Sequence, residues 1–179
     1  MYRPWVGSVV LFLAVAVVVL RPWEKAPEAG SAEATARVIR VVDGDTVEAR
    51  IGGRVEDVRL IGVDTPETVK PGTPVQCFGE RASHFTKRWL TGRRVRLVFG
   101  VERHDVYERL LAYVYLADST SPVSQHGKGR ARERLFNAIL VRRGLARTLT
   151  IPPNDRFASR FQGYALAAAR RGRGLWGAC

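Results

Sequence analysis

Three β-like runs follow one another closely between Ala36 and Val63, and no other feature constrains the fold as strongly. Valine and isoleucine recur through "ARVIRVV", "TVEARI" and "VEDVRLIGV", a composition that is typical of strands. Gly52 and Gly53 lie between the second and third runs and supply a hairpin turn. The folded part of the chain is therefore expected to begin as a β-sheet.

A helix is expected to interrupt the strands. Phe78, Ala82, Phe85 and Trp89 recur at helical spacing, and Gly92 ends the segment. Two more strand-like runs follow, "RRVRLVFG" and "RLLAYVYLAD". The order of three strands, one helix and two strands fits a small, partly closed five-stranded barrel with the helix covering one end.

Two further helices are expected after the barrel. The run "RLFNAILVRRGLAR" predicts a short helix that ends at Gly144, and residues 121–133 before it indicate a polar loop. A longer helix follows two prolines, with Asn154 as its N-cap, and continues to about Arg171. Helices packed on a β-barrel make the predicted fold class α+β.

The segment from Trp5 to Leu20 contains sixteen residues and no charge. That length is long for the apolar part of a signal peptide and short for a membrane span of about 20 residues, so a cleaved signal peptide and a signal anchor both remain open. We expect this element over residues 1–22, a flexible tether over 23–35 and the folded domain over 36–179. Either reading directs the chain to export, as a secreted protein or as an outward-facing, membrane-anchored protein of the cell envelope.

The charge balance favours a polyanionic partner. The chain has 29 Lys and Arg residues against 17 Asp and Glu residues, a formal net charge of +12 and a pI of about 10.8. Such a surface attracts nucleic acid or an anionic membrane.

Four carboxylates lie beside the ends of the first strands. Asp43 and Asp45 flank Gly44, which is a strong turn signal, and Asp64 and Glu67 follow the third strand. If these side chains gather at one rim of the barrel, their mutual repulsion calls for a cation or for arginines. Oxygen ligands suit Ca²⁺ or Mg²⁺ better than Zn²⁺, so a plain turn and a hard-cation site are both open.

Arg59 and Arg109 add positive charge to strand-like segments that do not need it. Each could belong to a solvated strand face. Beside a carboxylate cluster, however, guanidiniums and a metal ion are natural stabilisers of the charge that grows on a phosphodiester under attack. The combination indicates phosphodiester chemistry.

The segments "VVDGDTV", "RLIGVDTPET" and "DVYERLLAYVY" resemble, in order and approximate spacing, the signature segments of the staphylococcal-nuclease-like (thermonuclease) family. The run "LFNAILVRRGLAR" is similar to that family's segment after the barrel, so the resemblance extends roughly from Ala36 to Trp176. It implies an OB-fold barrel with C-terminal helices. It also implies a Ca²⁺-dependent endonuclease that acts on DNA and RNA, and we expect a monomer.

The resemblance implies how the carboxylates are used. Asp45 and Asp64 would bind calcium through their side chains, with the carbonyl oxygen of Thr65 as a third ligand. Asp43 would lie behind them and help to hold the ion. Glu67 would act as general base on the attacking water, or orient it.

The resemblance also implies the substrate contacts. Arg59 and Arg109 would grip the scissile phosphate, and Tyr107 would line the nucleotide pocket. The family commonly has glycine where Glu108 stands in this chain, which places an acid beside Arg109. The run "LARTLTIPPND" has no aromatic residue to stack on a base, and the basic loop Ser119–Glu133 offers either a substitute surface or a solvated face.

The main alternative is a catalytically weak OB-fold module that binds nucleic acid at the cell surface. A pure binder of polyanions gains nothing from four carboxylates beside its groove. The presence of Asp45, Asp64 and Glu67 together with the two arginines therefore favours an enzyme.

The chain has two cysteines. Cys77 lies at the start of the first predicted helix, and Cys179 is the last residue of the chain. They could be two free thiols or one disulfide. Export favours the disulfide, because such bonds persist outside the reducing cytosol.

Overall fold

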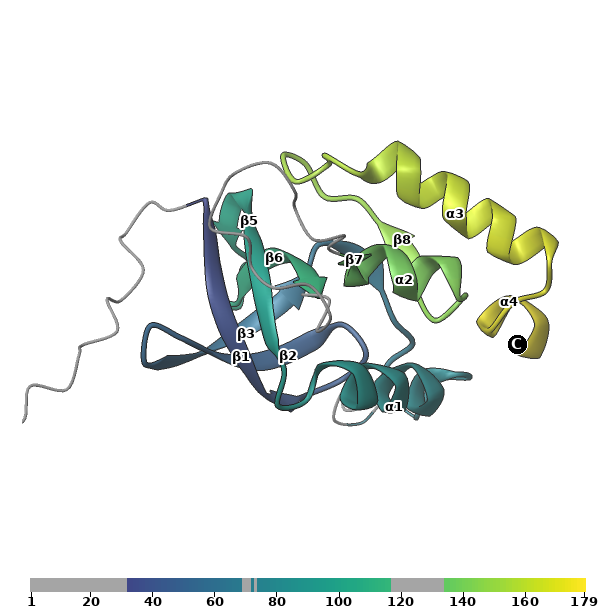
Figure 1. The fold of residues 1–179 in the computed structure, drawn as a ribbon. Helices are drawn as coiled ribbons and strands as arrows, with labels where there is room; N and C mark the ends of the chain where they lie inside the picture. The colour runs from purple at the N-terminus through teal and green to yellow at the C-terminus, as the bar shows by residue number, and fades with distance from the viewer. Residues whose placement is uncertain (1–31, 69–71, 73, 117–133) are drawn as a thin grey trace, which may run out of the picture.

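The computed structural model describes residues 32–68, 72, 74–116 and 134–179. Within these ranges the chain forms a β-barrel with helices along one side and across one end (Figure 1). The predicted signal segment of residues 1–22, most of the tether and the basic loop Ser119–Glu133 lie outside the described residues. The first strand begins at Glu33, within the segment expected to be tether.

Five strands close into the barrel, which confirms the expected OB-fold of the α+β class. They are β1 (Glu33–Val41), β2 (Thr46–Ile51), β3 (Arg54–Leu60), β5 (Arg94–His104) and β6 (Leu110–Leu116). Hydrogen bonds join them in the order β3-β2-β1-β5-β6, and a parallel pairing of β3 with β6 closes the sheet. Alternating residues point inward to a core that includes Val47, Leu60, Leu97 and Val114, each at most 1% exposed. A two-residue strand, β7 (Arg134–Leu135), extends the sheet beyond β6.

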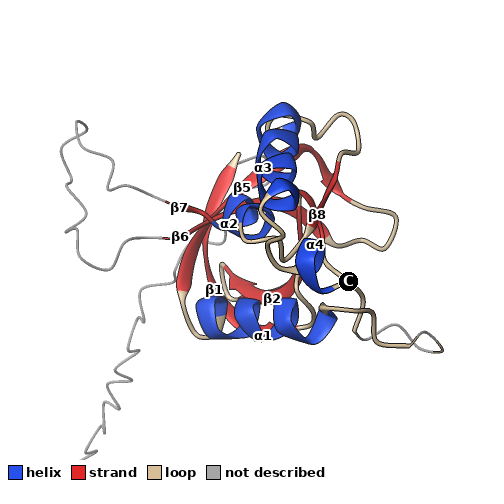
Figure 2. Cartoon of the chain, turned by 90° about the vertical axis from the view of Figure 1, so that its right-hand side faces the viewer, coloured by secondary structure: helices blue, strands red, loops and turns tan. Residues whose placement is uncertain are grey.

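The described residues form the helices α1 (Gly79–Leu90), α2 (Phe136–Arg142) and α3 (Ala158–Arg170), which pack on the barrel core, and the short α4 (Leu175–Ala178), which packs against α3. Helix α1 lies across one end of the barrel, because its buried stripe of Ala82, Phe85 and Leu90 faces the core (Figures 1 and 2). On α2, the buried amide of Asn137 accepts the N–H of Val114 at 2.9 Å and donates to the carbonyl of Ile61 at 2.8 Å. This side chain ties α2 to the end of the barrel where the carboxylates gather.

Four short elements were not predicted from the sequence: β7, α4 and two further strands. Strands β4 (Gly62–Asp64) and β8 (Arg147–Leu149) pair antiparallel in a small second sheet, so the segment after α2 lies beside the segment after β3. The predicted N-cap role of Asn154 is wrong, because α3 begins only at Ala158. The Asn154 side chain is buried and instead bonds to both backbone groups of Glu102, at 2.9 and 3.2 Å.

Candidate active site

The segment Asp43-Gly44-Asp45 is a tight connection from β1 to β2. The Asp43 carboxylate accepts the N–H of Asp45 at 3.1 Å, and Thr86 of α1 donates its hydroxyl to the Gly44 carbonyl at 2.7 Å. A Cβ on Gly44 would lie 2.7 Å from the Thr65 side chain, so only glycine lets the two segments approach this closely. The turn is therefore real, and it also places Asp45 beside the segment that follows β4.

Asp45 joins the turn to that segment. Its side chain is 6% exposed, and Oδ2 accepts the N–H of Thr65 at 2.6 Å and the Thr65 hydroxyl at 2.9 Å. The other oxygen, Oδ1, lies 3.1 Å from Nη1 of Arg59 and accepts the Thr46 hydroxyl at 3.2 Å. A buried carboxylate is stable here because these donors replace its water.

Arg59 brings two carboxylates to one point. Its Nη1 donates to the carbonyl of Val63 at 2.9 Å and contacts Asp45, while Nη2 lies 3.5 Å from Oδ1 of Asp64. The Arg59 side chain is only 13% exposed, whereas that of Asp64 is 51% exposed. The Arg59 side chain is thus largely buried and does not belong to a solvated strand face. Asp64 presents its carboxylate to solvent next to it.

The carboxylates of Asp43 and Asp45 lie close together near Arg59. Burial and the neighbouring carboxylate of Asp45 raise the pKa of Asp43 to about 6, although a hydrogen bond from the Asp45 backbone and the charge of Arg59 oppose the rise. The turn therefore favours a further positive charge near Asp43 and Asp45.

The donors at this rim fit a hard cation. In the part of the chain that the structure describes, no three His, Cys, Asp or Glu side chains are grouped closely enough to make a complete protein ligand set. Two carboxylates, from Asp45 and Asp64, converge on Arg59, and the backbone of Thr65 lies between them in the chain. Calcium accepts such a partial set of carboxylate and carbonyl oxygens, because water completes its six to eight ligands.

A cavity of about 280 Å³ lies beside Arg59. Arg59 and Arg109 both line it, because the parallel pairing of β3 with β6 sets Arg59 opposite Leu111, two residues after Arg109. Tyr107, 75% exposed, also lines the cavity, and the Arg109 guanidinium lies 5.2 Å from the centre of its ring. The three side chains predicted to contact the substrate thus share one pocket.

The walls of this cavity include residues that the sequence did not single out. Asp105 pairs with Arg109 at 2.6 Å and lines the cavity beside it. Leu149 and Ile151, 40% and 60% exposed, form an aliphatic side of the pocket. The i, i+4 spacing of Asp105 and Arg109 was the one sequence signal for this ion pair. Such pairs are expected within helices, however, and this segment is a loop.

Glu67 and Glu108 are the remaining acids near the predicted site. Glu67 follows Thr65 by two residues, and its carboxylate accepts the N–H of Thr68 at 2.8 Å. Glu108 is exposed and has a backbone φ of 62°, a conformation that glycine adopts more readily.

The two cysteines form a disulfide that closes the chain end onto α1. The Cα atoms of Cys77 and Cys179 lie 6.0 Å apart, and the bond spans a sequence separation of 102. Figure 2 shows α4 and the C-terminus beside the start of α1, as this link requires.

Comparison with known proteins finds relatives that are nucleases. The family described as "Staphylococcal nuclease homologue" matches residues 57–178. The chain is 42% identical to a thermonuclease of Staphylococcus intermedius, over 93% of this chain and 95% of that protein. It is 36% identical to a thermonuclease of Staphylococcus hyicus, over 95% of each. A third relative, endonuclease YncB of Bacillus subtilis, is 36% identical over 69% of this chain and 52% of that protein.

Proposed function

The chain belongs to the staphylococcal nuclease homologue family and is a nuclease, a hydrolase of phosphodiester bonds, and we propose that it is a calcium-dependent endonuclease that cuts DNA and RNA outside the cytoplasm. The observation that carries this proposal is the position of Arg59. Its guanidinium contacts the carboxylates of Asp45 and Asp64 and also lines the cavity that contains Arg109. Acidic ligands for a cation and basic ligands for a phosphate therefore meet at one residue.

In this proposal Asp45, Asp64 and the Thr65 carbonyl hold the ion, and Asp43 supports them from the turn. Calcium would supply positive charge to a phosphate oxygen and lower the pKa of a water beside it. A cation at this place would offset the repulsion between the neighbouring carboxylates of Asp43 and Asp45.

The protein side chains perform the remaining steps. Glu67 takes a proton from the attacking water or orients that water toward phosphorus. Arg59 and Arg109 donate N–H groups to the oxygens of the phosphate, where negative charge grows as the fifth bond to phosphorus forms. The P–O ester bond opposite the incoming water then breaks, and the leaving alkoxide takes a proton from solvent. Tyr107 lines the pocket of the adjoining nucleotide.

Export is proposed on the sequence and on the disulfide. Residues 1–22 would be a signal peptide or signal anchor, and the tether that follows would end before Glu33 rather than at residue 35, because β1 begins there and pairs with β5. A Cys77–Cys179 bond is typical of proteins outside the cytosol. No helix among the described residues is long and apolar enough to span a membrane.

The proposal is tested by incubating the purified chain with single-stranded DNA and with RNA in Ca²⁺, in Mg²⁺ and in chelator. We expect internal cleavage of both polymers in Ca²⁺ and little in Mg²⁺, because the smaller ion demands stricter octahedral geometry. Full activity in chelator would refute the metal proposal, and binding without cleavage in Ca²⁺ would favour the nucleic-acid-binding module instead.

A further inference from the structure

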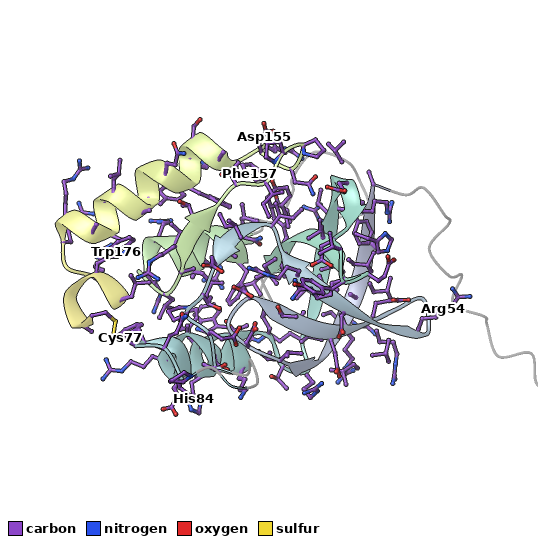
Figure 3. All side chains as sticks on the ribbon, turned by 180° about the vertical axis from the view of Figure 1, so that it is seen from behind. Arg54, Cys77, His84, Asp155, Phe157 and Trp176 are labelled. Atoms are coloured by element: carbon purple, nitrogen blue, oxygen red, sulfur yellow. A yellow bond between two sulfur atoms is a disulfide. The ribbon has the colours of Figure 1, made fainter. Side chains whose placement is uncertain are left out.

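A second and larger cavity, of about 900 Å³, lies between α1, the end of α2 and the turn from α3 to α4. It shares none of its lining residues with the cavity at Arg59 and Arg109. We call it the arginine groove, after its basic lining of Arg81, His84, Arg88, Arg142, Arg143 and Arg173. Figure 3 labels His84, a residue of the groove, toward the same end of the molecule as Cys77 and Trp176, with Arg54 at the opposite end.

The fold builds the groove from three separate segments. Helical spacing sets Arg81, His84 and Arg88 on one face of α1, above the buried ring of Phe85. Arg142 and Arg143 end α2, so they project from its C-terminus. The Cys77–Cys179 disulfide then holds the start of α1 against α4.

The last wall depends on a close backbone contact. The N–H of Leu175 donates to the carbonyl of Gly144 at 2.8 Å, and a Cβ on Gly144 would collide with the carbonyl of Arg173. Glycine at both 144 and 174, each with positive φ, permits this approach. Arg173 is thereby placed opposite α1.

Aromatic rings hold several of these guanidiniums in place. Arg81 lies 5.3 Å from the centre of the Phe78 ring, and Arg143 lies 5.0 Å from that of Phe85. Arg142 lies 5.3 Å from the centre of the Tyr164 ring. A stacked guanidinium keeps its N–H donors at its edge, so these donors are ordered before a ligand arrives.

The arginine groove has no acidic counterpart. None of its five arginines forms an ion pair with a carboxylate in the described ranges, and no Asp or Glu lines the cavity. The partial negative charges at the C-termini of α1 and α2 stabilise the positive charges of Arg88, Arg142 and Arg143. The dipoles do not account for Arg81, near the start of α1, or for Arg173, outside any helix. Concentrated like charge of this kind is relieved by an anion.

The arginine groove also continues toward the candidate active site. His84 lines a neighbouring cavity of about 270 Å³ together with Val42, Thr68, Lys87 and one acid, Glu80. Val42 precedes Asp43 and Thr68 follows Glu67, so this small cavity lies between the groove and the acidic rim. An extended anion could therefore run from one to the other.

We propose that the arginine groove binds the sugar-phosphate backbone of a single-stranded nucleic acid, as a second contact for the strand that is cut at Arg59 and Arg109. This inference rests on the proposed function for the identity of its ligand. Guanidiniums bind phosphates bidentately, and their spread over three segments fits a chain of phosphates better than a single anion. A flexible single strand bends into a concave groove, whereas a duplex with a persistence length of about 50 nm does not.

The test compares two variants with the same loss of charge. The groove variant carries Arg81→Gln, Arg142→Gln and Arg173→Gln. The control variant carries Arg50→Gln, Arg54→Gln and Arg94→Gln, which are exposed residues of the barrel strands. Affinity for a fluorescent 20-nucleotide oligothymidylate is measured in chelator, so that no cleavage is required, at several salt concentrations.

We expect the groove variant to bind roughly 10-fold or more weakly near 0.1 M salt, with a log–log salt dependence shallower by about 2, since each single-strand phosphate contact contributes about 0.7. The control variant should stay within a few-fold of wild type. Equal losses in the two variants, or wild-type affinity in the groove variant, would overturn the proposal. A triple Arg→Lys variant at the groove positions checks folding, and it should recover much of the affinity because it keeps the charge.

Two further measurements separate the possible failures. A trinucleotide reaches only the catalytic cavity, so wild type and groove variant should cleave it equally in Ca²⁺, and a selective loss in the groove variant would contradict a separate site. Binding to vesicles of anionic lipid, with an unchanged affinity for the oligonucleotide, would replace the nucleic acid with a membrane as the groove's ligand. Absence of cleavage in every sample would refute the proposed function while leaving the binding comparison valid.

Discussion

One carboxylate oxygen of Asp105 lies 2.6 Å from Nη2 and 2.8 Å from Nε of Arg109. The other oxygen accepts the backbone N–H groups of Tyr107 and Arg109, at 2.9 and 3.0 Å. Burial alone would raise the pKa of Asp105, but the hydrogen bonds from Arg109 and from the two backbone groups outweigh it, and the pKa lies below its ordinary value. The guanidinium that we propose to contact the scissile phosphate is therefore oriented before the substrate binds.

Asp105→Asn should lower the melting temperature at pH 7 by removing this ion pair. A carboxylate with a depressed folded pKa stabilises the fold fully above its unfolded pKa of about 3.9, and this contribution is lost as the pH falls through the folded value. The difference in Tm between wild type and variant should therefore shrink on acidification below about pH 4. Thermal unfolding followed by circular dichroism at pH 7, 4 and 3 measures it, and a difference that stays constant or grows would contradict the account.

Glu67→Gln should reduce kcat by about 10²-fold or more, the usual cost of losing a general base. The fold should survive, because glutamine can still accept the N–H of Thr68. Glu56→Gln, which alters a partly exposed acid of β3 outside the cavity of Arg59 and Arg109, is the matched control and should stay within a few-fold of wild type. Equal rates in the Glu67 variant and the control would place the base elsewhere.

Glu108→Gly should stabilise the protein by roughly 1 kcal/mol, because glycine adopts the φ of 62° without strain. It should also lower KM for nucleic acid, since it removes a negative charge beside Arg109. Glu108→Gln separates the two effects, because it removes the charge and keeps the strain. Chemical denaturation and steady-state kinetics on the three proteins measure both, and a gain in stability shared by the glutamine variant would refute the backbone explanation.

Much of this architecture was predictable from the sequence, because local patterns specify it. The alternation of Val and Ile predicted the barrel strands, and the spacing from Phe78 to Trp89 predicted α1. Pairings between distant short segments were not predictable. Strands β4 and β8 have three residues each, too few for a periodic signal, and they lie far apart in the sequence.

The hydrogen-bond partners of polar side chains at the site were also not fully predictable from the sequence. The motif Asp43-Gly44-Asp45 indicated both a turn and an acidic rim, and the structure contains the turn beside Asp64. Asn154 before a helical pattern looks like an N-cap, and only the tertiary structure reveals its bonds to Glu102. A polar residue chooses among local and distant partners by geometry that the sequence alone does not display.

Replacing both Cys77 and Cys179 by serine should destabilise the protein by up to about 4.7 kcal/mol, the chain-entropy value for a closed loop of about 100 residues. The barrel should remain folded, because its core does not contain the bond. Thermal unfolding of the variant, and of wild type with and without reductant, measures the effect. A reductant-insensitive Tm in wild type together with an unchanged Tm in the variant would show that the bond does not stabilise the fold.

The central claim is that this nuclease cuts phosphodiester bonds with calcium held between Asp45 and Asp64. The most direct measurement is the initial rate of single-stranded DNA cleavage as a function of Ca²⁺ concentration. It is made on wild type, on Asp64→Asn and on a control, Asp57→Asn, which neutralises an exposed carboxylate of β3. Asp64 is the informative ligand because its side chain is 51% exposed, so that neutralising it spares the buried bonds of Asp45. We predict no cleavage without Ca²⁺, saturable activation of wild type and control, and an Asp64→Asn curve shifted to at least about 10-fold higher Ca²⁺, as expected for loss of a charged ligand. Three superimposable curves, or a wild-type rate that is unchanged in chelator, would contradict the claim.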